Sequence, residues 1–112
     1  MKIAFTAKGS TWESKMDPRF GRMDFLVVFD EENKSLNSKD NREGAEEAHG
    51  VGTQTAKDLI ESGANVLITG NGPGANAAKV LEHAKIEIFV GAGSMNIDEA
   101  LKAYYDGKLE SF

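Results

Sequence analysis

The chain has 112 residues, a length that predicts one domain spanning residues 1–112 with its own hydrophobic core. It contains no cysteine, which excludes disulfides, thiolate metal ligands and cysteine nucleophiles, and its net charge of −5 disfavours non-specific binding to nucleic acid. No stretch has the length and apolarity of a signal peptide or a membrane span, so we expect a cytoplasmic protein that binds neither membranes nor nucleic acid.

The first part of the chain predicts three strands, separated by a long connection and a hairpin. Residues 2–7 and 25–29 are apolar runs typical of buried strands, whereas 35–38 is a polar run that suits the edge of a sheet. The connection over residues 8–23 carries four basic side chains against two acidic ones. Connections of this length without structure of their own are usually functional or disordered.

The next predicted element is a helix over about residues 51–62. The residues expected on its inner face are Ala56, Leu59 and Ile60. The last predicted helix starts near residue 97, where Asn96 and Glu99 have the spacing of a capping box. Both helices therefore have one face that is expected to pack on a sheet.

Two strand–turn–helix units fill the rest of the chain. The apolar runs 66–68 and 86–90 predict buried strands, and each is followed by a glycine-dense turn, 70–74 or 91–95, and then by a helix. The element order is β-β-β-α-β-α-β-α, in which the hairpin makes the second strand antiparallel and the crossovers make the later pairs parallel. Ligands of open α/β sheets bind at the carboxyl ends of the strands, so we expect both glycine turns, the basic connection and His49 to meet there.

The turn Gly70-Asn71-Gly72-Pro73-Gly74-Ala75 fits the loose dinucleotide pattern G-x-G-x-x-A. The complete fingerprint also needs an acidic residue at the end of the next strand, and that strand ends in Val90-Gly91. A Walker A phosphate loop is excluded because no G-K-[ST] follows. Two interpretations stay open: an anion-binding turn at a helix N-terminus, or glycines that let a strand and a helix pack closely.

Two other places carry candidate ligand groups. Arg19 and Arg22 flank a turn glycine and could hold an anion through charge-assisted hydrogen bonds, or they could be solvated loop residues. His49 is followed by Gly50 and Gly52 at the entrance to a helix and could be a metal ligand, a hydrogen-bond donor or a capping residue. Catalysis has little support, because Ser10, Thr11 and other hydroxyl groups have no evident base partner.

Three ordered motifs resemble the dinitrogenase iron-molybdenum cofactor biosynthesis family, the small domain of NifX-like proteins and of the C-terminus of NifB-like ones. They are Phe20-Gly21-Arg22, His49-Gly50-Val51-Gly52 and Ile68-Thr69-Gly70-Asn71-Gly72-Pro73-Gly74-Ala75-Asn76-Ala77. The similarity extends through the last helix to Leu109. Arg19 stands where members often have a histidine, which removes one possible cluster ligand.

The resemblance implies a ribonuclease-H-like three-layer α/β fold. Its mixed sheet would have five strands in the order 3-2-1-4-5, with strand 2 antiparallel and helices on both faces. It also implies a non-catalytic accessory protein that binds or carries an iron–sulfur or iron–molybdenum cofactor precursor and meets cluster-assembly proteins. The alternative is a regulatory module that binds a small anion or nucleotide at the glycine turns.

The expected ligand-binding residues lie in the basic connection, at the start of the first helix and in the two glycine turns. They are Arg19, Phe20, Gly21, Arg22, His49, Gly70, Asn71, Gly72, Gly74, Gly91, Gly93 and Ser94. His49 is the one expected metal ligand among them.

Overall fold

The computed structural model describes residues 1–42 and 51–112, which form one mixed sheet with helices. The strands are β1 (Lys2–Ala7), β2 (Phe25–Asp30), β3 (Ser35–Asp40), β4 (Val66–Ile68), β5 (Glu87–Val90) and β6 (Glu110–Ser111). The helices are α1 (Val51–Ser62), α2 (Ala75–His83) and α3 (Ile97–Tyr105). None of these helices is long and apolar enough to cross a membrane. The predicted order of elements is confirmed up to α3.

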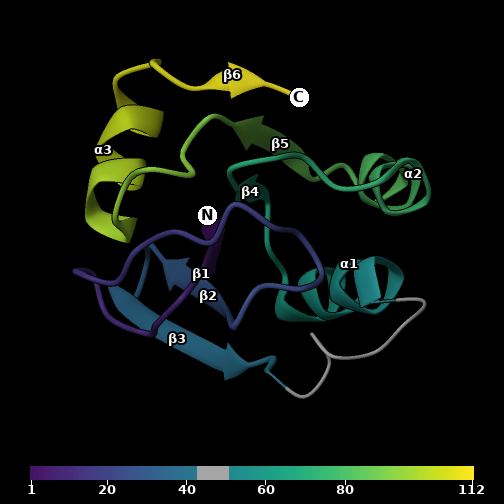
Figure 1. The fold of residues 1–112 in the computed structure, drawn as a ribbon, viewed down its shortest axis with the longest axis horizontal. Coiled ribbons are helices and arrows are strands. Elements are labelled where there is room, and N and C mark those ends of the chain that lie inside the picture. Colours follow the sequence, from purple (N-terminus) through teal and green to yellow (C-terminus); the bar gives the residue numbers. More distant parts are fainter. Residues whose placement is uncertain (43–50) are drawn as a thin grey trace.

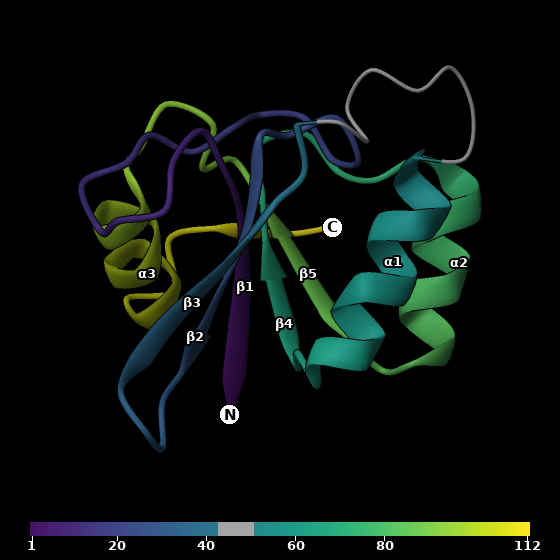
Figure 2. The same cartoon turned by 90° about the horizontal axis from the view of Figure 1, so that it is seen from below.

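The molecule has three layers (Figures 1 and 2). Helices α1 and α2 lie side by side on one face of the sheet, and α3 covers the other face. Two apolar clusters fill the spaces between the layers: one joins the sheet to α1 and α2, and the other joins it to α3. The prediction of helices on both faces is therefore confirmed. The ribonuclease-H-like label stays a prediction that rests on the family resemblance.

Strand β1 lies between the antiparallel and the parallel part of the sheet. It pairs antiparallel with β2 over its whole length and parallel with β4, which in turn pairs parallel with β5. Its residues from Ile3 to Ala7 are fully buried because helices or loops cover both faces. The carboxyl ends of β1, β4 and β5 therefore share one edge, shown at the top of Figure 2. We call it the carboxyl edge.

The predicted number of five strands is wrong, because β6 adds a sixth. In the sheet order β3-β2-β1-β4-β5-β6, this two-residue strand pairs antiparallel with Phe89 and Val90 of β5. The backbone N–H of Phe112 extends the ladder by donating to the carbonyl of Ile88 at 2.9 Å. Glu110 and Ser111 are polar and exposed, so no apolar pattern marks this strand in the sequence.

The predicted inner face of α1 needs one correction. Ala56 and Leu59 are fully buried in the cluster between the sheet, α1 and α2, whereas Ile60 is 42% exposed. Because Ile60 follows Leu59 by one position, the turn of the helix rotates its side chain away from the sheet. A sequence window with two adjacent apolar residues does not say which of them faces inward.

Candidate functional site

The long connection over residues 8–23 folds along the carboxyl edge. Met16 forms a bridge with Ala7, and Lys15 forms another with Asn96 at the start of α3. The Met16 N–H donates to the carbonyl of Met95 at 2.9 Å, and the Met16 side chain is 1% exposed. This connection is therefore held by both β1 and the second glycine turn, although it has no helix of its own.

Three buried polar residues join this connection to the sheet. The Thr6 hydroxyl donates to the carbonyl of Asp17 at 2.8 Å and lies 2.7 Å from the Thr69 hydroxyl. The Asp17 N–H donates to the carbonyl of Thr6 at 2.9 Å. All three residues are fully buried, where a polar group without a partner would be costly. These hydrogen bonds therefore fix where the connection crosses the ends of β1 and β4.

The Asp17 carboxylate is held by a two-point contact with Arg19. Arg19 donates from Nε to Oδ1 at 2.9 Å and from Nη2 to Oδ2 at 2.8 Å, and its backbone N–H also donates to Oδ1 at 3.0 Å. The Asp24 N–H donates to Oδ2 at 3.3 Å. Burial alone would raise the pKa of Asp17, but these hydrogen bonds and the charge of Arg19 together lower it.

Arg19 therefore has a structural partner that the sequence analysis did not assign. Its side chain is 51% exposed, so one side of the guanidinium group still faces solvent. Asp17 neutralises much of its charge, which weakens the attraction between the Arg19 guanidinium group and an anionic ligand. In the sequence, only the spacing Asp17-Pro18-Arg19 could have suggested the pair.

Pro18 packs tightly between the two glycine turns. A Cβ atom on Gly70 would lie 2.6 Å from the Cα atom of Pro18 and 2.9 Å from the Cα atom of Gly93. A Cβ atom on Gly93 would lie 3.3 Å from the Cβ atom of Pro18. The Asn71 N–H donates to the carbonyl of Pro18 at 2.8 Å. Both glycines thus permit close backbone approach, which is the packing interpretation for these two positions.

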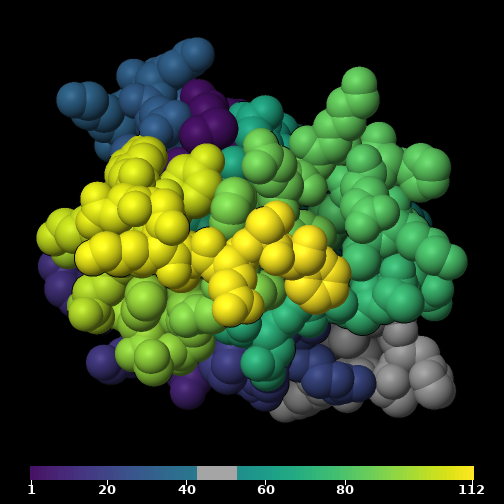
Figure 3. Space-filling model, turned by 90° about the horizontal axis from the view of Figure 1, so that it is seen from above, coloured from purple at the N-terminus to yellow at the C-terminus, as the bar shows by residue number. Residues whose placement is uncertain are grey.

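The outer part of the first glycine turn is more open. Asn71 and Gly74 are exposed, and a Cβ atom on Gly74 would meet nothing within 4 Å. A Cβ atom on Gly72 would overlap the ring of Phe112, which follows β6. Figure 3 shows the end of the chain, in yellow, on the surface of the molecule beside the green atoms of α2. Gly72 therefore leaves room for an aromatic ring beside the turn.

The two helices that follow the glycine turns begin differently. Gly74 caps α2 without any side-chain hydrogen bond, and the first turn of α2 has no acidic residue. At α3, Asn96 and Glu99 form the predicted capping box, with distances of 2.8 and 3.0 Å. The N–H groups of Ile97 and Asp98 donate to carbonyls of the long connection. Within residues 1–42 and 51–112, no side chain caps the first N–H groups of α2, so this helix start can accept an anion, whereas that of α3 is already satisfied.

The remaining predicted residues have mixed surroundings. Phe20 packs against the core on the α1 and α2 side, and Gly21 has a φ of 91°, a conformation that glycine adopts readily. Arg22 is half-buried and Ser94 is exposed. Gly91 has a φ of 96° and open space around the position of its missing Cβ atom.

His49 lies outside the described residues, so its predicted role as a ligand stays a prediction. Within residues 1–42 and 51–112, no group of three or more His, Asp or Glu side chains could hold a metal ion. Thr6, Asp17, Pro18 and Thr69 build the edge and were not predicted as site residues.

Residues 1–107 match the family model described as dinitrogenase iron-molybdenum cofactor. The chain belongs to this family. The match confirms the resemblance that the three motifs indicated. A curated relative, an uncharacterised protein of Methanocaldococcus jannaschii, is 32% identical over 114 residues, covering 100% of this chain and 92% of that protein.

Solved structures of similar proteins share the fold. The apo form of the orange protein from Desulfovibrio gigas is 32% identical, with a TM-score of 0.91 over 99% of this chain and 92% of the other. A candidate NifB protein from Thermotoga, assigned to the DUF35 family, is 27% identical, with a TM-score of 0.83 over 98% of this chain and 91% of the other. The family fold thus covers nearly the whole chain.

The Asp17–Arg19 contact predicts a specific pH dependence of stability. Folding lowers the pKa of Asp17 below its ordinary value of 3.8. As the pH falls from about 3.8 through this lower pKa, the unfolded chain therefore binds more protons than the folded chain does. The stabilisation from Asp17 should be complete above that interval and lost within it. Asp17→Asn should cost about 1–3 kcal/mol at pH 7, because Arg19 then loses a charged partner.

The measurement is urea unfolding of both proteins between pH 7 and pH 2. The difference in the free energy of unfolding should shrink as the pH falls below 4. Asp106→Asn, at an exposed position after α3, is the control and should change stability by less than about 0.5 kcal/mol. A difference between wild type and Asp17→Asn that stays constant with pH would contradict this account.

The Pro18 contact predicts unequal effects of two glycine substitutions in one turn. Gly70→Ala should lower the free energy of unfolding by about 1–3 kcal/mol, because the new Cβ atom would overlap backbone atoms of Pro18 and Gly93. Gly74→Ala places its Cβ atom in open space and should cost less than about 1 kcal/mol. Chemical denaturation measures the free energy of unfolding of both variants. An equal decrease in Gly70→Ala and Gly74→Ala would rule out the packing role of Gly70.

Proposed function

We propose that the chain is a non-catalytic accessory protein that binds or carries an anionic iron–sulfur or iron–molybdenum cofactor precursor. The observation that carries this proposal is the family match over residues 1–107. The similarity to the orange protein and to the candidate NifB protein supports it, since both extend over nearly the whole chain. Cluster-assembly proteins would be its partners, and residues 1–112 would act as one domain.

The carboxyl edge has the chemistry that such a cargo requires. A cluster that brings its own sulfides needs hydrogen-bond donors and positive charge rather than cysteine ligands, and this chain has no cysteine. Arg22, the uncapped start of α2 and the exposed Asn71 amide are donors on this edge. His49 would be the one imidazole ligand in this proposal.

The residues predicted to bind the cargo would contribute in different ways. Gly70 and Gly93 contribute through packing, because Pro18 fills the space between them. Asn71, Gly72 and Gly74 remain as direct contacts, together with Phe20, Gly21 and Arg22 of the long connection. Arg19 would contact the cargo only through the side of its guanidinium group that Asp17 leaves exposed.

This proposal is tested by anaerobic titration with isolated iron–molybdenum cofactor or its precursor, followed by amide chemical shifts. We expect shifts in residues 15–23, 49–52 and 70–76. Arg22→Ala and His49→Ala should each weaken binding about five-fold or more, because each removes a charged or donor group from the cargo. Lys102→Ala, on the exposed face of α3, is the charge-matched control and should leave the affinity unchanged.

Two results would count against the assignment. An absence of shifts at the carboxyl edge would separate this chain from cluster binding. An unchanged affinity in both Arg22→Ala and His49→Ala would leave cluster binding intact but remove the proposed site.

A second candidate function is a small-anion or nucleotide-binding regulatory module. The uncapped N-terminus of α2 favours it, because its first N–H groups and its helix dipole attract an anion. The capped start of α3 offers no equivalent place.

Phosphate-bearing ligands should then raise the thermal unfolding temperature, because a ligand that binds only the folded state stabilises it by mass action. A screen of inorganic phosphate and nucleotides at millimolar concentration measures the shift. Asn76→Asp, in the first turn of α2, should abolish the shift by repelling the anion. Asn65→Asp adds the same charge just before β4, at the opposite end of the sheet, and is the control that should keep the shift. A flat response for every ligand would exclude this function.

A further inference from the structure

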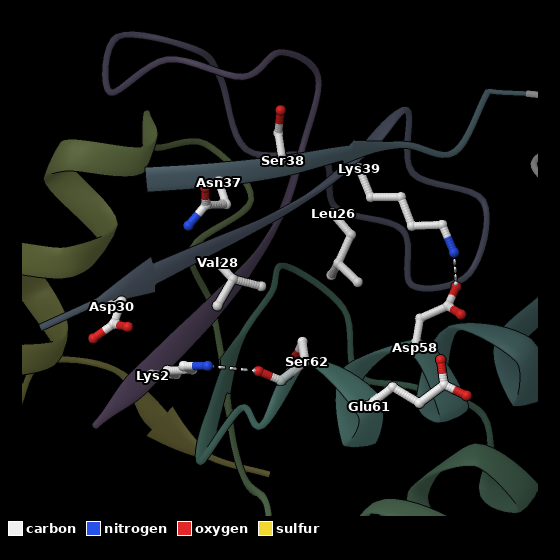
Figure 4. Close-up of a pocket in the computed structure, with 10 residues that line it drawn as sticks. All are labelled: Lys2, Leu26, Val28, Asp30, Asn37, Ser38, Lys39, Asp58, Glu61 and Ser62. Carbon is white, nitrogen blue, oxygen red and sulfur yellow. Dashed lines mark hydrogen bonds and ion pairs between the residues drawn. The ribbon is translucent and has the colours of Figure 1, made fainter. Parts of the chain in front are cut away.

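A separate pocket of about 370 Å³ lies between the antiparallel part of the sheet and α1. Its volume falls in the range of small-molecule sites, roughly 300–1,000 Å³. Figure 4 shows Leu26 and Val28 of β2 pointing into the space between the sheet and the helix. Lys2 lies at the start of β1, and Ser62 at the end of α1, so this part of the pocket is at the end of the sheet opposite the carboxyl edge.

The two ammonium groups of the pocket are engaged by the protein itself. Lys39 Nζ lies 2.9 Å from a carboxylate oxygen of Asp58, and Lys2 Nζ donates to the carbonyl of Ser62 at 3.2 Å. Both contacts join the sheet to α1 (Figure 4). Neither lysine therefore makes this pocket attractive to an anion.

Negative charge remains after these two contacts. Asp30 and Glu61 also line the pocket. The Asp30 carboxylate already accepts hydrogen bonds from Glu32 and Asn33 in the turn that follows β2. No hydrogen bond or ion pair joins the Glu61 side chain to another of the described residues, so Glu61 is the carboxylate that is open to a ligand. Helix α1 adds the negative end of its dipole and has no basic residue in its last turn. Lys2 of β1 supplies an ammonium group there, which shows that this helix end accepts one.

We propose that this pocket binds an aliphatic ammonium ion. Its hydrocarbon chain would lie on Leu26 and Val28, as lysine stems commonly lie on apolar surface. Its charged group would face Glu61, and a second ammonium group, where present, would remain near the solvent-exposed rim of the pocket. A free diamine and the lysine side chain of a partner protein both have this chemistry. The site is distinct from the one proposed for the cargo and uses none of its residues.

The test is a titration of the full chain with 1,5-diaminopentane and, separately, with a capped glycine–lysine–glycine peptide, followed by amide chemical shifts. We expect saturable shifts in the residues that line the pocket, and the tighter of the two ligands identifies the source of the ammonium group. The uncharged analogue 1,5-pentanediol should produce no saturable shift. Equal responses to the diol and the diamine would overturn the proposal.

Substitutions sharpen the test. Glu61→Gln should weaken diamine binding two- to five-fold, the range expected for one exposed charge pair. Glu82→Gln, an exposed carboxylate on α2 outside this pocket, is the matched control and should not change it. Lys2→Met should strengthen binding, because it removes the resident ammonium group.

Thermal unfolding of each variant checks that the fold is retained. Equal effects of Glu61→Gln and Glu82→Gln, or the absence of shifts with both charged ligands, would overturn the proposal. None of these results depends on whether a cluster binds at the carboxyl edge.

Discussion

The hydrogen-bonded contact among Thr6, Asp17 and Thr69 is the constraint on which the carboxyl edge depends. It ties the long connection to the ends of two neighbouring strands, in a place where none of the three residues reaches solvent. Once Asp17 is fixed, Pro18 must lie between the two glycine turns, and only glycine leaves room for it there. The arrangement of the proposed site therefore follows from one buried polar contact rather than from the glycine turns alone.

This constraint also explains why the helices that follow two similar glycine turns differ in their ability to bind an anion. The long connection reaches the start of α3, where its carbonyls and the Asn96–Glu99 box satisfy the first N–H groups. It does not cap α2, which begins at Gly74 without a side-chain partner. The sequence repeats strand, glycine turn and helix, but the two helix starts differ. The first N–H groups of α3 are hydrogen-bonded within the protein, whereas those of α2 can bind a ligand.

The sequence predicts most of the fold because burial and periodicity are strong local signals. The runs from Lys2 to Ala7 and from Val66 to Ile68 carry enough apolar residues to mark their strands. β6 lacks such a signal, since Glu110 and Ser111 form a strand only through backbone bonds to β5. The pairing of Asp17 with Arg19 was equally hidden, because burial of a loop carboxylate depends on tertiary packing that a local pattern does not record.

Charge is distributed unevenly over this acidic chain. The long connection has more basic than acidic side chains, whereas the pocket beside α1 has Asp30, Asp58 and Glu61 against two engaged lysines. An anionic cargo would be repelled from the pocket beside α1, and a cationic ligand would be repelled from the carboxyl edge. The first site uses mainly loop residues, and the second uses side chains of strands and of α1. Opposite charge thus makes the two proposed sites selective for different ligands within one small domain.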